Sequence, residues 1–330
     1  MKNIKFLLRI FNFNSLKTLF RISKEVSFKS KRNRFIIIID MIYCGITYGT
    51  AFHDYQEFEF YLLNKKQRKT YLTRAINNKI VKKFNNKEYW DIFNNKVEFN
   101  RIFKDFIKRE TINLDTATLN DFKKFIINKD KIIVKPCEGE GGKGISIISL
   151  ENQNIKKLYN DLKNNKTTLI EEVIIQHDDL NKLYDKSVNS LRMFTFNNGN
   201  AYFLQAILKI GNGGVVDNFS SGGMYTFVDN NGIVITKAID KNDDIHKIHP
   251  ISKCEIVGFK VPFFEEAVEL VKKASFKVKE VGYIGWDVAI TNEGPLIIEG
   301  NCYPGVFQIK PSLSKDKTGI LPKYKKIMKI

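Results

Sequence analysis

The sequence predicts an α+β protein in which a helical N-terminal region precedes a strand-rich C-terminal half. In the first part, apolar residues recur at helical spacing, first at Phe6, Leu7, Ile10 and Phe11 and then at Leu16, Leu19, Phe20 and Ile22. Beyond residue 130, β-branched runs separated by Gly and Asn turns are typical of strands, at 131–135, 145–150, 168–175, 191–196 and 201–210. Two helices are expected in this half, near 152–163 and 263–280.

Three regions are expected along the chain. Residues 1–85 read as a helical N-terminal region, and residues 86–130 as a small α/β segment with short helices at 90–93, 99–107 and 119–127. Residues 131–330 form the main strand-rich domain. No internal repeat and no Pro-rich or Gly/Ser-rich linker marks an independent module. A chain of 330 residues can bury its core as one large domain or as two to three packed subdomains.

The formal net charge is +18, which could attract nucleic acid, an anionic membrane or a phosphorylated substrate. Asn, Ile, Lys and Phe are abundant along the whole chain, so a coding bias explains part of this charge, and no nucleic acid is expected as a partner. The basic N-terminal helices could lie on an anionic bilayer with aromatic side chains inserted. Packing against the rest of the protein explains the same pattern, so peripheral membrane contact stays open.

Several features favour a cytoplasmic location, with the inner face of the membrane as an alternative. The cysteines show no C-x-x-C pair and no His at ligand spacing, which indicates free thiols. Arg9 interrupts the first apolar run before it is long enough for a signal peptide. The longer apolar run from Phe35 to Phe52 contains Asp40, Gly45 and Thr47, so a buried helix is expected there instead of a membrane span.

A glycine-rich turn between two predicted strands carries the first candidate for phosphate binding. Glycines at 139, 141, 142 and 144 allow backbone N–H groups to approach phosphate oxygens, and Lys135 and Lys143 supply compact positive charges. No Gly-Lys-Ser/Thr opens a helix here, so the segment is not a Walker A loop. An ordinary hairpin with incidental lysines explains the same pattern equally well.

Two apolar strands flanking the turn at 291–295 carry the candidate metal ligands. If the turn centres on Glu293, then Asp287 faces Glu299 across an antiparallel pair, and opposed carboxylates repel unless a cation lies between them. Asn301 lies two residues beyond Glu299, on the same face of its strand. All-oxygen ligation favours Mg²⁺, or Mn²⁺, over zinc. A solvated hairpin face is the alternative, which the apolar neighbours Trp286 and 296–298 disfavour.

Taken together, these segments resemble the ATP-grasp superfamily. The resemblance rests on Lys135-Pro with the Lys143 loop, the run 169–174, Asn189-Ser-Leu-Arg192, and Asp287 followed by Glu299-Gly-Asn301. The sequences at 211–223, 285–290 and 294–301 look most like the sugar-transfer-associated ATP-grasp proteins, a group related to alpha-L-glutamate ligases. The resemblance covers about residues 90–310 and implies two α/β subdomains that sandwich ATP.

The resemblance also implies roles for individual residues. Lys96, Lys135 and Lys143 would hold ATP phosphates, and Arg192 would meet the transferring phosphoryl group, although it could instead be a strand arginine paired with an acid. Lys209 would touch phosphate or substrate, or simply end a strand. The adenine edge would be read by the segment Glu171, Glu172, Val173 and Ile174. His177 would contact ribose or substrate, with a surface-loop histidine as an equal alternative.

The function implied is an ATP- and Mg²⁺-dependent ligase that joins a carboxylate to an amine through an acyl phosphate. The family name suggests an acceptor in surface polysaccharide or glycoconjugate biosynthesis, small or glycan-linked. Two alternatives stay open at this point. One is a kinase-like phosphoryl transferase that forms no amide, and the other is a non-enzymatic basic module that would bind anions with a steep salt dependence.

Overall fold

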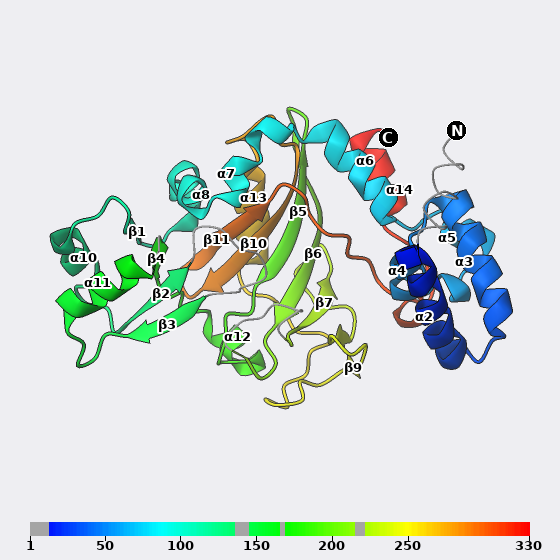
Figure 1. The fold of residues 1–330 in the computed structure, drawn as a ribbon, viewed down its shortest axis with the longest axis horizontal. Helices are drawn as coiled ribbons and strands as arrows, with labels where there is room; N and C mark the ends of the chain where they lie inside the picture. Colours follow the sequence, from blue (N-terminus) through cyan, green and yellow to red (C-terminus); the bar gives the residue numbers. More distant parts are fainter. Residues whose placement is uncertain (1–12, 136–144, 166–168, 215–221) are drawn as a thin grey trace. The chain divides into compact units, whose positions relative to one another are not determined.

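The computed structural model describes residues 13–135, 145–165, 169–214 and 222–330. Contacts divide the chain into two compact units, which we call unit 1 (residues up to 83 together with 305–330) and unit 2 (residues 84–304) (Figure 1). The expected boundary at 85 falls close to the first division. The expected domain 131–330 differs from the second, because residues 305–330 pack with the N-terminal helices. No division of this kind falls at 130, so that boundary stays a prediction.

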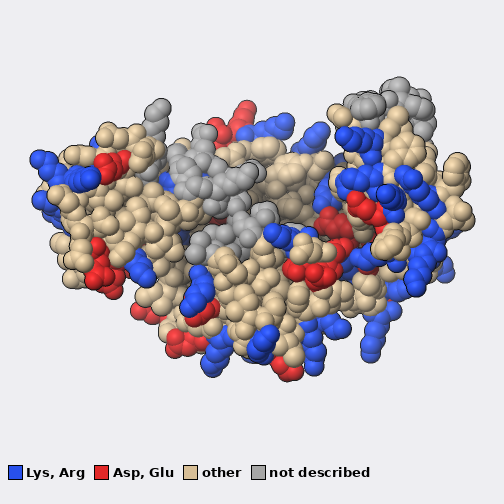
Figure 2. Space-filling model, turned by 60° about the horizontal axis from the view of Figure 1, so that its bottom comes forward, with Lys and Arg blue, Asp and Glu red and all other residues tan. Residues whose placement is uncertain are grey.

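Unit 1 is helical, which confirms the expected helical N-terminal region. Its helices are α2 (Phe13–Ser30), α3 (Arg34–Tyr48), α4 (Phe52–Glu57), α5 (Lys65–Arg68), α6 (Arg74–Phe84) and α14 (Leu321–Met328), with 3₁₀ turns η1 (Phe60–Leu62) and η4 (Pro311–Leu313). Capping residues set the helix ends: the Asn33 side chain accepts from the Phe35 N–H at the start of α3, and Gly49, with φ of 67°, ends it. Many Lys and Arg side chains lie on these helices (Figure 2).

Helix α3 is buried on one face only, so the expectation of a buried helix is wrong for the other face. Ile37, Met41 and Cys44 are buried against the unit, whereas Phe35 and Ile39 are 75% and 62% exposed. Within the described parts of the chain, no helix combines the length and apolarity that a membrane crossing requires.

Asp40 interrupts the apolar run of α3 and is neutralised inside unit 1. Both of its carboxylate oxygens accept from the Arg68 guanidinium, at 2.7 and 2.6 Å, and Oδ2 also accepts from the Tyr55 hydroxyl at 2.6 Å. A bidentate pair of this kind is the usual way to place a carboxylate beside an apolar core. The acid therefore fixes α3 to the α4–α5 region.

The returning segment 305–330 completes unit 1 through specific hydrogen bonds. The Gln308 side chain pairs with both backbone groups of Leu72, at 3.1 and 2.9 Å. The Ser312 N–H donates to the Glu59 carboxylate at 2.8 Å, and the Gly319 N–H donates to the Thr70 hydroxyl at 2.8 Å. Glu59 is buried, so this contact satisfies one of its acceptors.

Unit 2 contains two sheets, and the smaller has the strand order β1-β4-β2-β3 with every pair antiparallel. Its strands are β1 (Thr111–Asn113), β2 (Lys131–Lys135), β3 (Ser146–Ser149) and β4 (Leu169–Glu172), and helices α10 (Leu119–Phe125) and α11 (Ile155–Asn164) complete it. Phe122, Ile132, Leu162 and Ile170 belong to a common buried cluster. The glycine-rich turn and Lys143 lie outside the described residues.

The larger sheet has the order β11-β10-β5-β6-β7-β8-β9, again antiparallel throughout (Figure 1). Its strands are β5 (Leu191–Asn197), β6 (Ala201–Ile210), β7 (Met224–Val228), β8 (Ala238–Ile239), β9 (Ile245–His246), β10 (Tyr283–Thr291) and β11 (Gly294–Asn301). The accompanying helices are α7 (Asp91–Asn94), α8 (Lys96–Ile102), α9 (Lys104–Ile107), α12 (Asp178–Leu183) and α13 (Phe264–Ala274).

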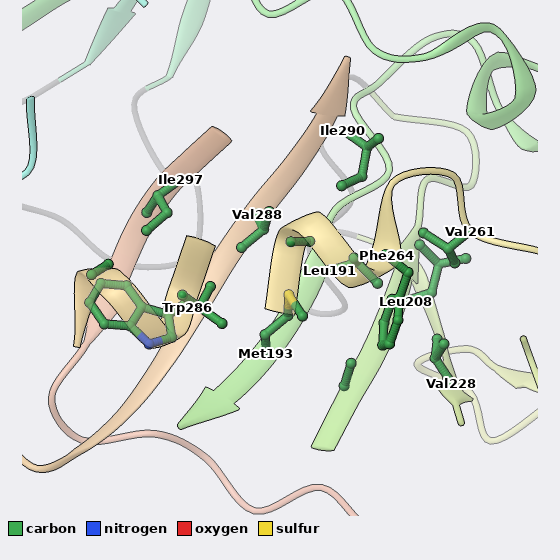
Figure 3. Packing of buried hydrophobic residues seen from close by; sticks show 14 of the residues in the cluster. Leu191, Met193, Leu208, Val228, Val261, Phe264, Trp286, Val288, Ile290 and Ile297 are labelled. Carbon is green, nitrogen blue, oxygen red and sulfur yellow. The ribbon is translucent and has the colours of Figure 1, made fainter. Parts of the chain in front are cut away.

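The hydrophobic core of unit 2 lies on one face of this large sheet. Helices α7, α8, α9 and α13 contact strand β11, and α13 also contacts β5, β6 and β10. Trp286 and Val288 of β10, together with Leu191 and Met193 of β5, belong to this core (Figure 3). Because successive strand residues point to opposite faces, Asp287 and Arg192 lie on the face away from the core.

The buried thiols lead to a first prediction. Burial raises the pKa of Cys44 to about 12 and that of Cys302 to about 11; it also raises the pKa of Cys254, but this thiol is only half-buried and reagents can reach it. Because the thiolate is the reactive form, we expect iodoacetamide at pH 8 to modify Cys254 at least about tenfold faster than either buried thiol. Peptide mass spectrometry over time measures the rates, with urea-unfolded protein as the control in which they converge. Faster labelling of Cys44 or Cys302 would contradict the burial described.

Candidate functional site

Asp287 and three other charged side chains, each from a different strand of the large sheet, lie close together. In the strand register, Asp287 pairs with Arg192 of β5 on one side and with Glu299 of β11 on the other. Lys209 of β6 reaches the same carboxylate from the next strand along. The alternation of strand side chains therefore places these groups on the face opposite the core.

A β-bulge sets the pairing of the two carboxylates. The tight turn joins Thr291 to Gly294, and this register alone would place Ile298 opposite Asp287. The ladder shifts between Asp287 and Val288, so that Ile298 is the extra residue and Glu299 becomes the partner. The predicted pairing of Asp287 with Glu299 is confirmed, although its cause is the bulge and not a turn centred on Glu293.

Asp287 is held ionised by two cations, the half-buried Arg192 and the buried Lys209. Its carboxylate accepts from Nε and Nη2 of Arg192, the latter at 2.9 Å from Oδ2, and from Nζ of Lys209 at 3.1 Å. Asp287 is only 4% exposed. Burial by itself would raise the pKa of Asp287, but Arg192 and Lys209 outweigh it and hold this pKa well below its usual range. The alternative of Arg192 as a strand arginine paired with an acid is thus realised in this structure.

Glu299 has the opposite electrostatic character. Burial raises its pKa, and the neighbouring Asp287 carboxylate raises it further, while Arg192 and Lys209 oppose both effects. Asp287 is buried and the adjacent Glu299 is half-buried, and their pKa values are shifted in opposite directions, so the pair gains from an added cation. The Asn301 amide nitrogen, on the same strand, is buried with no hydrogen-bond partner among the described residues.

The donor set fits a hard divalent cation. Asp287, Glu299 and Asn301 offer two carboxylates and one amide, the oxygen ligands that Mg²⁺ and Mn²⁺ prefer. Over the described residues, no group of three or more His, Cys, Asp or Glu side chains could hold a metal, so zinc-type ligation has no candidate there. The three residues thus remain the candidate ligands, and a metal would share Asp287 with Arg192 and Lys209.

A second buried cluster forms around Glu171 of the small sheet. Arg109 donates to both of its oxygens, at 3.0 and 3.1 Å, Lys135 forms an ion pair with Oε2, and the Asn100 amide donates to Oε1 at 3.0 Å. Burial opposes ionisation, but Arg109 and Lys135 lower the pKa of Glu171 to about 2. Burial lowers the pKa of Lys135, while Glu171 and Glu299 favour its charged form.

Arg109 joins the two clusters and was not anticipated from the sequence. Besides Glu171, its guanidinium donates to the carbonyl oxygens of Ile297, at 2.7 Å, and Ile298, at 3.1 Å. Ile298 is the bulged residue, so Arg109 ties the bulge of β11 to the small sheet. The short charged run Lys108-Arg109-Glu110 looks like any solvated turn, and no local signal distinguishes it.

The remaining predicted residues occupy several places in unit 2. Lys96 begins α8, and Val173 and Ile174 follow β4 in the segment that leads from the small sheet to α12. The Glu172 side chain accepts from the Glu110 N–H at 3.1 Å. His177 caps α12 by accepting from the Asp179 N–H at 3.1 Å, which gives it a structural role; contacts with adenine or ribose stay predictions for this group.

The start of the glycine-rich segment 211–223 is fixed by buried polar groups. The Gly211 N–H donates to the Asn189 amide oxygen at 3.0 Å, and its carbonyl lies 2.8 Å from Nε2 of His249. A Cβ at Gly211 would lie 2.1 Å from the Ser187 hydroxyl and 2.4 Å from the Tyr184 ring, so only glycine fits. Residues 215–221 of this segment lie outside the described parts.

The two sheets of unit 2, with buried cations and paired carboxylates at their junction, define the class of protein as ATP-grasp. The chain belongs to the sugar-transfer-associated ATP-grasp family, whose model matches residues 75–327. This match confirms the resemblance and the fold predicted from the sequence. It includes all of unit 2 and extends into α6 and α14 of unit 1.

Solved structures with similar folds include ligases. An L-amino acid ligase from Bacillus licheniformis aligns with 15% identity and a TM-score of 0.40, over 64% of this chain and 41% of that one. A D-alanine–D-alanine ligase from Bacillus anthracis, complexed with ATP, aligns with 14% identity and a TM-score of 0.41, over 72% of this chain and 62% of that one. The chain thus spans less than two thirds of either structure. No curated protein matches the sequence significantly.

Proposed function

We propose that this protein is an ATP- and Mg²⁺-dependent ligase that joins a carboxylate to an amine through an acyl phosphate. The observation that carries the proposal is the charge of the junction between the two sheets of unit 2. The junction contains four cations and three carboxylates. The cations are Arg109, Lys135, Arg192 and Lys209, and the carboxylates are Glu171, Asp287 and Glu299. An excess of buried positive charge beside a candidate metal site suits a polyphosphate that carries its own cation.

The position of each residue in the site suggests its role. Arg192 and Lys209, fixed by Asp287, would face the transferring phosphoryl group and offset its charge, and Lys135 would approach the phosphates from the small sheet. When bound at Asp287, Glu299 and Asn301, Mg²⁺ would neutralise phosphate oxygens during transfer to the substrate carboxylate. The acyl phosphate formed is a mixed anhydride with a good leaving group, so a neutral amine can attack its carbonyl carbon and release phosphate. The chain offers carboxylates and lysines for this chemistry and requires no covalent enzyme intermediate.

The acceptor we propose is a component of surface polysaccharide or glycoconjugate assembly, either small or glycan-linked, and the site of action is the cytoplasm or the inner face of the membrane. The support is the family description, which associates this group with sugar transfer. A uronic acid and an amino sugar are the first pair of substrates to test, because they present a carboxylate and an amine respectively.

The test combines binding with product analysis. Calorimetry should show ATP binding that requires Mg²⁺, and a screen of carboxylates and amines should then find a pair that releases ADP and yields an amide by mass spectrometry. ADP released with a phosphorylated product and no amide would instead assign a kinase-like activity. Binding of anions that needs no Mg²⁺ and falls steeply with salt would favour the basic binding module.

A matched pair of lysine substitutions locates the activity. Lys209→Gln removes one cation but leaves the Arg192–Asp287 pair intact, so the fold should persist while ADP release falls at least about tenfold. Lys237→Gln, at an exposed position in the same unit, should behave as the native chain. If both variants retain the native rate, Lys209 has no role in the reaction.

A further inference from the structure

The N-terminal helices of unit 1 expose an apolar surface that their own core does not use. On α3, Phe35, Ile36, Ile39 and Tyr43 are 75%, 62%, 62% and 41% exposed, and we call these four residues the apolar stripe. Ile39 lies three or four residues after Ile36 and Phe35, and Tyr43 lies four after Ile39, so the four residues share one side of the helix, opposite the buried Ile37, Met41 and Cys44. A helix that is apolar on nearly all sides normally has both faces covered.

Helix α2 extends this surface with two aromatic side chains. Phe20 and Phe28, two turns apart, are 50% and 89% exposed, and Lys24 lies between them on the same face. The Arg34 guanidinium lies 5.8 Å from the centre of the Phe20 ring and donates to the Phe20 carbonyl at 2.8 Å, which joins α2 to the start of α3. Phe20 therefore lies beside the N-terminal end of the stripe, and Phe28 lies on the same face of α2 as Phe20.

The charges around this surface have one predominant sign. Seven exposed basic residues lie on α2, in the α2–α3 connection and at the start of α3: Lys17, Arg21, Lys24, Lys29, Lys31, Arg32 and Arg34. Between residues 13 and 34 the only acidic residue is Glu25, which pairs with Arg21. Figure 2 shows many Lys and Arg side chains, and fewer Asp and Glu side chains, on the surface of unit 1.

We propose that this surface docks on an anionic lipid bilayer, with the apolar stripe, Phe20 and Phe28 inserted at the interface and the basic residues against lipid phosphates. Aromatic and aliphatic side chains beside a cluster of Lys and Arg are the chemistry that binds peripheral helices to such bilayers. A second copy of the chain fits less well as the partner. It carries the same basic cluster and the same net charge of +18, so the two copies would repel each other. The contact that we propose is peripheral, along helices α2 and α3 at the bilayer surface.

The experiment measures sedimentation of the full chain with vesicles, without nucleotide, so that its outcome is independent of the proposed ligase activity. Vesicles of phosphatidylcholine containing phosphatidylglycerol are compared with phosphatidylcholine alone. The native chain should bind the anionic vesicles at least about tenfold more tightly, since each basic residue near the surface adds to the attraction. Equal binding to both, or to neither, would overturn the proposal.

Two sets of substitutions test the two components of the surface. The first variant removes the apolar component and carries Phe35→Ser, Ile36→Ser and Ile39→Ser; its binding to vesicles should be at least about tenfold weaker. The second variant reverses two of the basic charges and carries Lys17→Glu and Lys24→Glu; its binding to anionic vesicles should be weaker. The matched controls lie on exposed positions of unit 2: Ile235→Ser with Ile248→Ser and Ile251→Ser, and Lys156→Glu with Lys241→Glu. Both controls should bind as the native chain does, and a stripe variant that binds equally well would sink the idea.

Two further measurements keep the result interpretable. Thermal unfolding followed by circular dichroism should show that the stripe variant is folded; if it is not, Phe28→Ser, at the most exposed position, replaces it and should still reduce binding. Sedimentation equilibrium without vesicles reports the oligomeric state. A native dimer that becomes monomeric in the stripe variant, with no vesicle binding by either, would assign the surface to a second copy and overturn the lipid proposal.

Discussion

Glu171→Gln is expected to lower the free energy of unfolding by about 3–5 kcal/mol, the usual cost of removing one partner from a buried ion pair. The substitution keeps the shape of the side chain but leaves Arg109 and Lys135, both largely buried, without a counter-charge. Urea unfolding at pH 7 measures the change. Glu110→Gln, which removes an exposed partner of Lys129, is the matched control and should cost less than about 1 kcal/mol.

The same cluster predicts a pH dependence. The folded-state pKa of Glu171 is lowered to about 2 from an ordinary value of 4.5, so its contribution to stability is complete above about pH 4.5 and is lost as the pH falls towards 2. In the Glu171→Gln variant, stability should therefore change less over this window than in the native chain. Glu171→Gln combined with Lys135→Gln should recover part of the loss, because one uncompensated cation is gone. A cost near zero for Glu171→Gln would mean that water compensates these cations.

Glu299→Gln is expected to separate stability from metal binding. The carboxylate is half-buried beside Asp287 and its pKa is raised, so a neutral isostere should leave the free energy of unfolding unchanged or slightly higher at pH 7. If Glu299 is a metal ligand, Mg²⁺-dependent binding of ATP should weaken at least about tenfold. Calorimetry with and without Mg²⁺, together with urea unfolding, measures both effects on the same samples.

Asp287→Asn is the contrasting substitution at the other carboxylate. It leaves Arg192 and Lys209 buried without their counter-charge, so both stability and ATP binding should fall, the former by about 3–5 kcal/mol. If the Glu299→Gln variant binds ATP in the presence of Mg²⁺ as tightly as the native chain does, then the pair of Asp287 and Glu299 is not the metal site. Unchanged stability in Asp287→Asn would contradict the charge arrangement described.

The strands of unit 2 were predictable because their patterns are local. Runs at 131–135, 191–196 and 201–210 contain apolar and β-branched residues bounded by Gly or Asn turns, and the structure places strands there within a residue or two. The sequence pattern also predicts Glu299 as the partner of Asp287, but it contains no sign of the bulge at Ile298. The bulge is held by a residue distant in sequence, Arg109 in the connection between α9 and β1, which donates to the carbonyl of Ile298, and no local pattern reveals it.

Other features could not be found because they arise from contacts between distant parts of the sequence. Arg109 acts on residues 62 and 188 positions away, within an unremarkable charged turn. The return of residues 305–330 to the N-terminal helices likewise follows from tertiary packing and not from their composition. Helix α3 was expected to be buried because its residues are apolar, yet hydrophobicity shows only that a face needs a partner, not that this chain supplies it.

The discontinuity of unit 1 has a consequence for how the protein folds during synthesis. The helices of residues 13–83 are complete before the ribosome begins unit 2, but Gln308 and the segment after it arrive only at the end. At about 5–20 residues per second, synthesis of the intervening unit takes roughly 10–45 s. For that interval the nascent helices lack their final packing partner, whereas unit 2 can fold as soon as Pro304 emerges. The helices that emerge first are thus the last to reach their final packed state.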